Sequence, residues 1–248
     1  MVQQTQPWSS DGGNVGVLLL HGLTGCPASM RPLGEALAEA GFAVELPLLP
    51  GHGTHWRDLA RTTWPDWAEG AIQALERLRA RTEAQVVVGL SMGGALTLHL
   101  ACTRGDDLSG IVVINPSLFG LNPRLKLLPA LRHVVPSVPN IGNDIAKPGA
   151  DEHAYPRMPL PALYSLTRLW RSMRGNLAAV KAPVLVFTSR QDHIVEPENS
   201  AAVVSRVSST DVEQVWLERS YHVATLDHDA DLIVDRTIAF VTRVTSHQ

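Results

Sequence analysis

Apolar residues follow two alternating patterns along the chain. Short apolar runs, most of them continuous, are typical of strands buried on both faces of a parallel sheet. They predict strands over residues 15–20, 42–46, 86–88, 111–114, 183–188 and 212–217. Between most of these runs, apolar residues recur every three or four positions, which is the spacing of an amphipathic helix. This spacing predicts helices over residues 27–40, 64–78, 92–104, 197–207 and 229–244.

The alternation of strands and helices predicts one α/β domain over residues 1–248, with a mostly parallel central sheet flanked by helices. Residues 115–180 interrupt this alternation, since they hold nine of the 17 prolines and no clear buried strand. The insertion is too long and too apolar for a free loop. We therefore expect a small cap, or lid, inserted after the strand Ile111–Ile114. A subdomain that only adds stability is the alternative.

The composition of the chain indicates which classes of protein can be excluded. The chain is 45% hydrophobic and 18% charged with a net charge of −3, which predicts a folded protein without a nucleic-acid partner. Cys26 and Cys102 show no metal-ligand spacing, so we expect two free thiols. Neither a metal nor an organic cofactor is expected. The first residues lack the pattern of a secretory signal, and no run of about 18 apolar residues occurs. We expect a cytoplasmic protein without stable membrane insertion.

A Gly-x-Ser-x-Gly motif, Gly89 to Gly93, lies between the strand at 86–88 and the following helix. A strand, a sharp turn and a helix in this order place the serine at the turn, where its dihedrals are strained and glycines are needed on both sides. Ser91 is thus a candidate nucleophile exposed at a helix N-terminus. The alternative is an ordinary glycine-rich turn.

Two further residues could activate Ser91. Asp192 follows the strand at 183–188 and His222 follows the strand at 212–217, so both are expected at the edge of the sheet that carries Ser91. A serine hydroxyl needs a base to take its proton and an acid to orient that base. His193 is badly placed to bridge Asp192 and Ser91, and Glu196 could replace Asp192 only if its loop folded back.

Acyl transfer also requires hydrogen-bond donors for the developing oxyanion. The backbone N–H of Met92, just after the serine, is one candidate donor. The other is the N–H of Leu23 in the turn His21–Gly25, which follows the first main strand. This second segment could also be a simple glycine-rich turn.

Several of these segments occur together in a known family. The chain resembles the bacterial carboxylesterases and monoacylglycerol lipases of the α/β-hydrolase fold. The resemblance rests on residues 21–25, 51–55, 89–94, 192–193 and 220–227, and on 140–145 and 154–155 of the expected cap. It implies Ser91 as nucleophile, His222 as base, Asp192 as its partner, and Leu23 and Met92 as oxyanion donors.

The resemblance also implies a cap that closes over an acyl chain, in which Ile145 is expected to contact the substrate. The chain departs from the family pattern at one position. Pro156 follows the Ala154-Tyr155 pair, where similar monoacylglycerol lipases carry an acidic residue. This departure favours activity on plain esters.

The expected function is hydrolysis of carboxylic esters with medium-length acyl groups, namely monoacylglycerols and simple alkyl or aryl esters, through an acyl-enzyme on Ser91. The partner is then a small-molecule ester. Transfer of the acyl group to an alcohol, or a perhydrolase activity, would use the same three residues. A ligand-binding receptor on the same fold is a third possibility, and it would usually show a damaged set of catalytic residues.

Overall fold

The computed structural model describes residues 5–246. Its strands are β1 (Trp8–Ser10), β2 (Val15–Leu20), β3 (Ala43–Leu46), β4 (Ala84–Leu90), β5 (Gly110–Ile114), β6 (Ser137–Pro139), β7 (Arg157–Pro159), β8 (Val184–Ser189) and β9 (Val212–Leu217). Its α-helices are α1 (Arg31–Glu39), α2 (Trp56–Leu59), α3 (Trp64–Arg79), α4 (Met92–Arg104), α5 (Leu128–Leu131), α6 (Leu160–Met173), α7 (Glu198–Arg206) and α8 (Ala230–Thr245). Short 3₁₀ helices cover Pro27–Ser29, Gly105–Asp107, Pro123–Leu127, Leu177–Ala179 and Ala224–Leu226.

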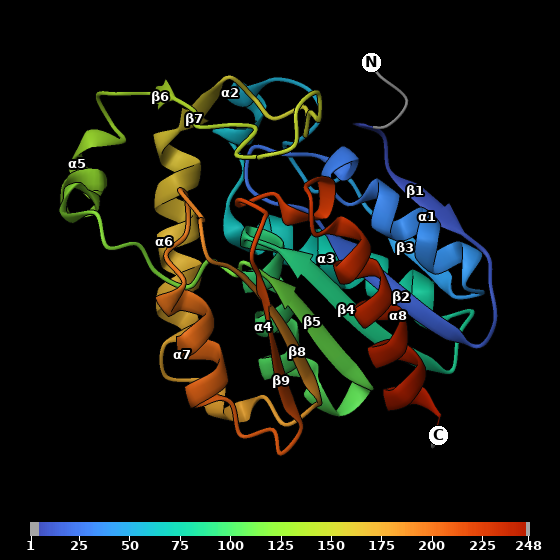
Figure 1. Cartoon of the computed structure of the whole chain (residues 1–248). Coiled ribbons are helices and arrows are strands. Elements are labelled where there is room, and N and C mark those ends of the chain that lie inside the picture. Colours follow the sequence, from blue (N-terminus) through green and yellow to red (C-terminus); the bar gives the residue numbers. More distant parts are fainter. Residues whose placement is uncertain (1–4, 247–248) are drawn as a thin grey trace.

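Within the described residues, seven strands form one sheet in the order β1-β3-β2-β4-β5-β8-β9. Every neighbouring pair is parallel except β1 with β3. Figure 1 shows α8 crossing one face of this sheet, while α3 and α4 lie behind it. The mostly parallel sheet flanked by helices confirms the predicted fold class, and β2 and β9 have the predicted bounds.

Alternation along the strands divides the core into two layers. Leu18 and Leu20 of β2 pack into the layer that also holds α3, α4 and α6. Val17 and Leu19 of the same strand point to the opposite face, toward the layer that holds α1 and α8. Because side chains alternate between the two faces of a strand, a strand covered on both sides must be apolar at every position. This explains the continuous runs in the sequence.

Strand β1 was not expected, since the sequence predicts only a polar leader before Val15. Trp8 to Ser10 pair antiparallel with β3 at the sheet edge. The Trp8 ring packs partly buried against the core layer of α1, beneath the guanidinium of Arg31. A three-residue edge strand is too short to show a hydrophobic period, and only the tertiary contact of Trp8 identifies it.

The interval 115–180 consists of two parts. Helix α6 packs against α3 and α4 and buries Leu166 and Leu169 in the main core, so it serves as the crossover helix between β5 and β8. The preceding residues, 119–159, carry α5 and the antiparallel pair β6–β7, with Ser137 opposite Pro159. A cap over the strand ends remains a prediction, and these residues are the part of the interval that could form it.

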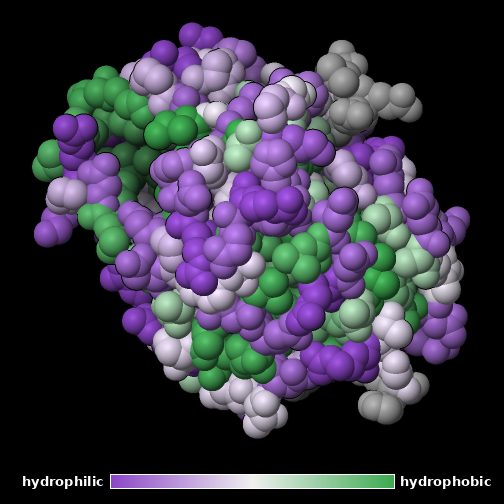
Figure 2. Space-filling view, viewed as in Figure 1, coloured by the Kyte–Doolittle hydropathy of each residue, from purple (hydrophilic) through white to green (hydrophobic). Residues whose placement is uncertain are grey.

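Large apolar side chains are exposed on residues 119–159. They are Leu121, Leu127, Leu131, Val134, Val138 and Ile141. Figure 2 shows hydrophobic surface gathered in the region of α5, at the left edge of the molecule. Across residues 5–246, no helix combines the length and the apolar character needed to cross a bilayer.

Candidate active site

Ser91 stands at the turn between β4 and α4 with φ 58° and ψ −115°. This backbone conformation is strained for a residue with a side chain. A Cβ atom on Gly89 would lie 2.1 Å from the carbonyl oxygen of Gly93, and one on Gly93 would lie 2.0 Å from that of Leu20. The two glycines of the motif are therefore required by close backbone approach. The Ser91 N–H also donates to the Ile114 carbonyl at 2.9 Å, which anchors the turn to β5.

His222 and Asp192 meet as a buried pair. The Nδ1 atom of His222 lies 2.7 Å from Oδ2 of Asp192, and their side chains are only 9% and 2% exposed. The other carboxylate oxygen, Oδ1, accepts the N–H groups of Ile194 and Val195 at 2.8 Å each. The carboxylate is thus fixed by its own loop. A hydrogen bond at Nδ1 directs Nε2 of the imidazole away from Asp192.

Opposing effects set the pKa of His222. Burial lowers the pKa, but the charge and hydrogen bond of Asp192, with the charges of Glu152 and Asp144, raise it above the ordinary histidine value. A general base must be neutral to accept a proton. Activity that depends on His222 as a base should therefore rise with pH through a midpoint above 6.5.

Asn115 connects three strand ends beside this pair. It follows β5 with φ 44°, a left-handed conformation that asparagine tolerates. Its Oδ1 accepts the Ser189 N–H at 2.8 Å, while its Nδ2 donates to the Ser189 hydroxyl and to the His222 carbonyl at 2.9 and 2.8 Å. The side chain therefore holds the His222 loop against the ends of β5 and β8.

Asp144 makes a second connection to the same loop. Its Oδ2 accepts the N–H of His222 at 3.1 Å and that of His193 at 3.2 Å, and its Oδ1 contacts the His193 ring at 2.7 Å. His193, the rival base in the sequence, therefore pairs with Asp144, and its side chain is 55% exposed. Asp192 holds the position beside His222 for which Glu196 was the alternative.

The turn with Leu23 lies next to Ser91, since a Cβ on Gly22 would be 3.5 Å from that of Ser91. Among residues 5–246, the N–H groups of Leu23 and Met92 donate to no other backbone or side-chain group. Thr24 in this turn has φ 64°, and its carbonyl accepts the Tyr155 N–H at 2.9 Å. Both expected oxyanion donors are thus unpaired, and the 119–159 segment braces the turn.

Beneath this turn lie two buried histidines. Nδ1 of His21 donates to the Gly22 carbonyl at 3.0 Å, and its Nε2 accepts the Leu49 N–H at 3.2 Å. The His52 ring packs edge-on against His21 at 4.8 Å, and its Nε2 is buried without a partner. Burial lowers the pKa of His21 to about 4, and burial with the nearby His21 lowers the pKa of His52 to about 3.

These lowered pKa values predict acid sensitivity of the fold. Below pH 6.5, His21 and His52 bind protons in the unfolded chain but stay neutral in the folded chain. Their contribution to the free energy of unfolding is therefore complete above pH 6.5 and is lost as the pH falls toward 4 for His21 and toward 3 for His52. Each histidine contributes a slope of up to about 1.4 kcal/mol per pH unit. In urea titrations from pH 7 to 4, His52→Leu should show a smaller slope than wild type. The control His228→Gln, at an exposed position, should keep the wild-type slope.

Ser91 and His222 line one cavity of about 480 Å³. Its walls are largely apolar and include Leu125, Val138 and Ile141 from the 119–159 segment. Ile145, which was expected to contact substrate, is not among the lining residues in the described chain. It packs, partly buried, against the core layer of α1 and α8. Contact between Ile145 and the substrate therefore remains a prediction, whereas Ile141 of the same segment lines the cavity.

Glu152 also lines the cavity and was missed in the sequence. Its Oε1 accepts the Asn143 N–H at 2.9 Å, and burial raises the pKa of this carboxyl above its ordinary value. An acidic side chain thus lines the cavity although Pro156 is not acidic, because Glu152 lies four residues before Pro156. The nearby Ala154-Tyr155 pair was a signal that this part of the segment approaches the site.

The chain is similar to known proteins over nearly its whole length. A family model described as serine aminopeptidase, S33, matches residues 14–229. A thermostable monoacylglycerol lipase of Bacillus sp. (strain H-257) is 40% identical, with 96% of this chain and 94% of that protein aligned. A carboxylesterase of Bacillus subtilis (strain 168) is 28% identical over 96% of this chain and 97% of its own length. A solved structure from work on the metagenome-derived lipolytic enzymes LipS and LipT has a TM-score of 0.94 and 40% identity, covering 97% of this chain and 98% of that one.

Proposed function

The chain belongs to the serine aminopeptidase S33 family and is a carboxylic ester hydrolase of the α/β-hydrolase fold, and we propose that Ser91, His222 and Asp192 carry out its reaction. The observation that supports this assignment is the buried His222–Asp192 pair on the cavity that Ser91 also lines. These residues come from three separate strand ends. Ser91 and His222 line one cavity, and Asp192 is paired with His222 beside it.

In the proposed mechanism, Ser91 Oγ attacks the ester carbonyl while His222 Nε2 takes its proton. The N–H groups of Leu23 and Met92 stabilise the oxyanion of the tetrahedral intermediate. His222 then gives the proton to the leaving alkoxide, which departs as the alcohol and leaves an acyl-enzyme. Water repeats the sequence, with His222 again as base, and releases the carboxylic acid and free Ser91. Asp192 stabilises the imidazolium at each stage.

The substrate class follows from the two kinds of surface in the cavity. The apolar wall of residues 119–159 suits an acyl chain, and we assign this segment as the cap. Glu152 suits a group that donates hydrogen bonds. A monoacylglycerol combines an acyl chain with two free hydroxyls, whereas a plain alkyl ester offers Glu152 no hydrogen-bond donor. We therefore favour monoacylglycerols of medium chain length over simple esters of the same acid.

A comparison of kcat/KM for 1-decanoylglycerol and ethyl decanoate tests this assignment. Wild type should prefer the monoacylglycerol, and Glu152→Gln should reduce kcat/KM for it by about tenfold, since a hydrogen bond to a charged group is lost. The value for ethyl decanoate should change much less. Asp151→Asn, an exposed neighbour that does not line the cavity, is the control. If Glu152→Gln reduced kcat/KM equally for both substrates, Glu152 would not recognise the glycerol head group.

A further inference from the structure

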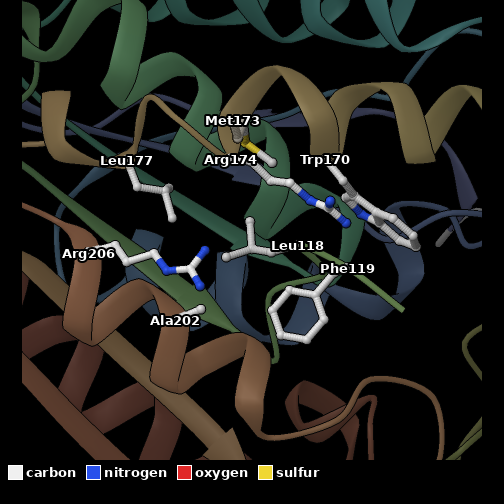
Figure 3. Close-up of a pocket in the computed structure, with 8 residues that line it drawn as sticks. All are labelled: Leu118, Phe119, Trp170, Met173, Arg174, Leu177, Ala202 and Arg206. Carbon is white, nitrogen blue, oxygen red and sulfur yellow. The ribbon is translucent and has the colours of Figure 1, made fainter. Parts of the chain in front are cut away.

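A second pocket lies beside the catalytic cavity, between the C-terminal ends of α6 and α7. It encloses about 240 Å³. Its apolar wall includes Leu118, Met173 and Leu177, and two arginines, Arg174 and Arg206, complete the lining. Figure 3 shows Arg206 extending from α7 toward the centre and Arg174 extending from α6 toward the ring of Trp170. None of these five residues lines the catalytic cavity.

The two arginines are unpaired cations. Within residues 5–246, no ion pair or side-chain hydrogen bond involves Arg174 or Arg206. A positive charge at a helix C-terminus is favourable, which accounts for arginine at both positions. This effect of the helix C-terminus does not explain why both arginines line the same apolar pocket. Two such groups around an apolar surface match a ligand with one anionic end and a hydrocarbon chain.

A third observation concerns the wall of the pocket. Trp170 is 7% exposed, and its indole Nε1 is buried without a hydrogen-bond partner. A buried indole N–H usually has an acceptor. Trp170 and Phe119 line both this pocket and the catalytic cavity, so they form the partition between the two. The partition therefore contains a buried indole N–H without an acceptor.

We propose that this pocket is a binding site for a medium-chain fatty-acid anion, the carboxylate product of ester hydrolysis. The carboxylate lies between Arg174 and Arg206, and the chain packs on Leu118, Met173 and Leu177. The volume is below the 300 Å³ or so at which pockets for drug-sized ligands begin, which suits one unbranched chain. The identity of the ligand as product rests on the proposed function, whereas the site itself does not. The enzyme thus holds its product on the far side of the Phe119–Trp170 partition.

Titration calorimetry with decanoate, below its micellar concentration, tests the site in the whole protein. Arg174→Gln and Arg206→Gln should each weaken decanoate binding about fivefold, as expected for partly solvated ion pairs. The matched control is Arg168→Gln, which removes an exposed arginine of α6 that does not line the pocket. Ala202→Phe, which fills the pocket from α7, should abolish binding at this site. Decanol and inorganic phosphate serve as probes that carry only the chain or only the charge.

The proposal holds if decanoate binding falls in both lining variants, stays unchanged in Arg168→Gln, and exceeds that of decanol and of phosphate. Binding that is equal in all arginine variants would place decanoate in the catalytic cavity and overturn the site. If Arg168→Gln weakened decanoate binding as much as the two lining variants do, the loss of binding would come from the change in net charge, and the proposed site would also be overturned. Turnover of 1-decanoylglycerol by the same variants separates the two proposals. Hydrolysis without specific decanoate binding rejects only the pocket, and decanoate binding without hydrolysis rejects only the proposed reaction.

Discussion

Ser91→Ala should reduce kcat for 1-decanoylglycerol by about four orders of magnitude or more, because the reaction loses the atom that forms the acyl-enzyme. The fold should survive, since alanine occupies the strained backbone conformation at no greater steric cost than serine. The loss should appear in kcat, with substrate still bound by the apolar cavity. Activity by titration of released acid, together with thermal unfolding, measures both quantities.

Ser117→Ala is the matched control for Ser91→Ala. Ser117 is a buried serine that lines the same cavity, and its backbone N–H donates to the Ser91 carbonyl at 3.1 Å. Alanine keeps that backbone bond, so the variant should retain activity near wild type. Should Ser91→Ala keep more than about one hundredth of the wild-type kcat, a different nucleophile would have to be sought.

Asp192→Asn should lower kcat by about three to four orders of magnitude, because an amide beside His222 stabilises neither the required tautomer nor the imidazolium. The pH profile supplies a second signature. Asp192 raises the pKa of His222, so its neutralisation lowers that pKa and moves the midpoint of the pH–rate curve to lower pH. We therefore expect Asp192→Asn to be less active than wild type and its activity to rise at a lower pH. Measurement of kcat/KM from pH 5 to 9 tests both expectations.

Asp144→Asn separates the catalytic role of Asp192 from loop anchoring. Asp144 is also close to His222, but it contacts only the main-chain N–H of that residue. Its replacement should reduce kcat far less than Asp192→Asn and shift the pH midpoint only slightly. If both variants lost kcat equally, the carboxylate of Asp192 would hold the loop in place and would not act on the imidazole.

The parts of the molecule that were predictable from sequence are those encoded by local spacing. Buried parallel strands need unbroken apolar runs, and the turn at Ser91 needs glycines two residues away on each side. Asp192 and His222 were found because each directly follows such a strand. The fold class is confirmed, whereas the catalytic roles of these residues remain predictions that the geometry supports.

The parts that were missed depend on contacts between distant segments. Asn115 reaches Ser189 and His222, which are 74 and 107 positions away. Glu152 reaches the cavity only because the segment around it folds against the turn at Thr24. No hydrophobic period marks such residues. Helix α6 was assigned to the insertion because prolines surround it, although its spacing of buried leucines is that of a core helix.

The cap segment is attached to the rest of the protein at its C-terminal half. The Tyr155 hydroxyl donates to the Gly51 carbonyl and accepts the Thr54 N–H, both at 2.9 Å. Asp227 accepts the N–H groups of Ala146 and Lys147 at 2.7 and 2.9 Å. These bonds fix residues 140–155 to the loop at residues 51–54 and to the loop that follows His222. Residues 121–138 supply exposed apolar side chains.

Most of the proposed acyl-binding wall therefore lies in a stretch that these bonds do not hold, whereas Glu152, with its proposed head-group contact, lies in the anchored stretch. If the proposed acyl-binding wall is correct, changes in side-chain size within residues 121–138 should reshape it without altering the bonds of residues 140–155. Such substitutions should alter the preferred acyl-chain length while Glu152 and the loop that carries His222 keep their positions. In the proposed enzyme, acyl-chain preference and head-group recognition are thus open to separate redesign.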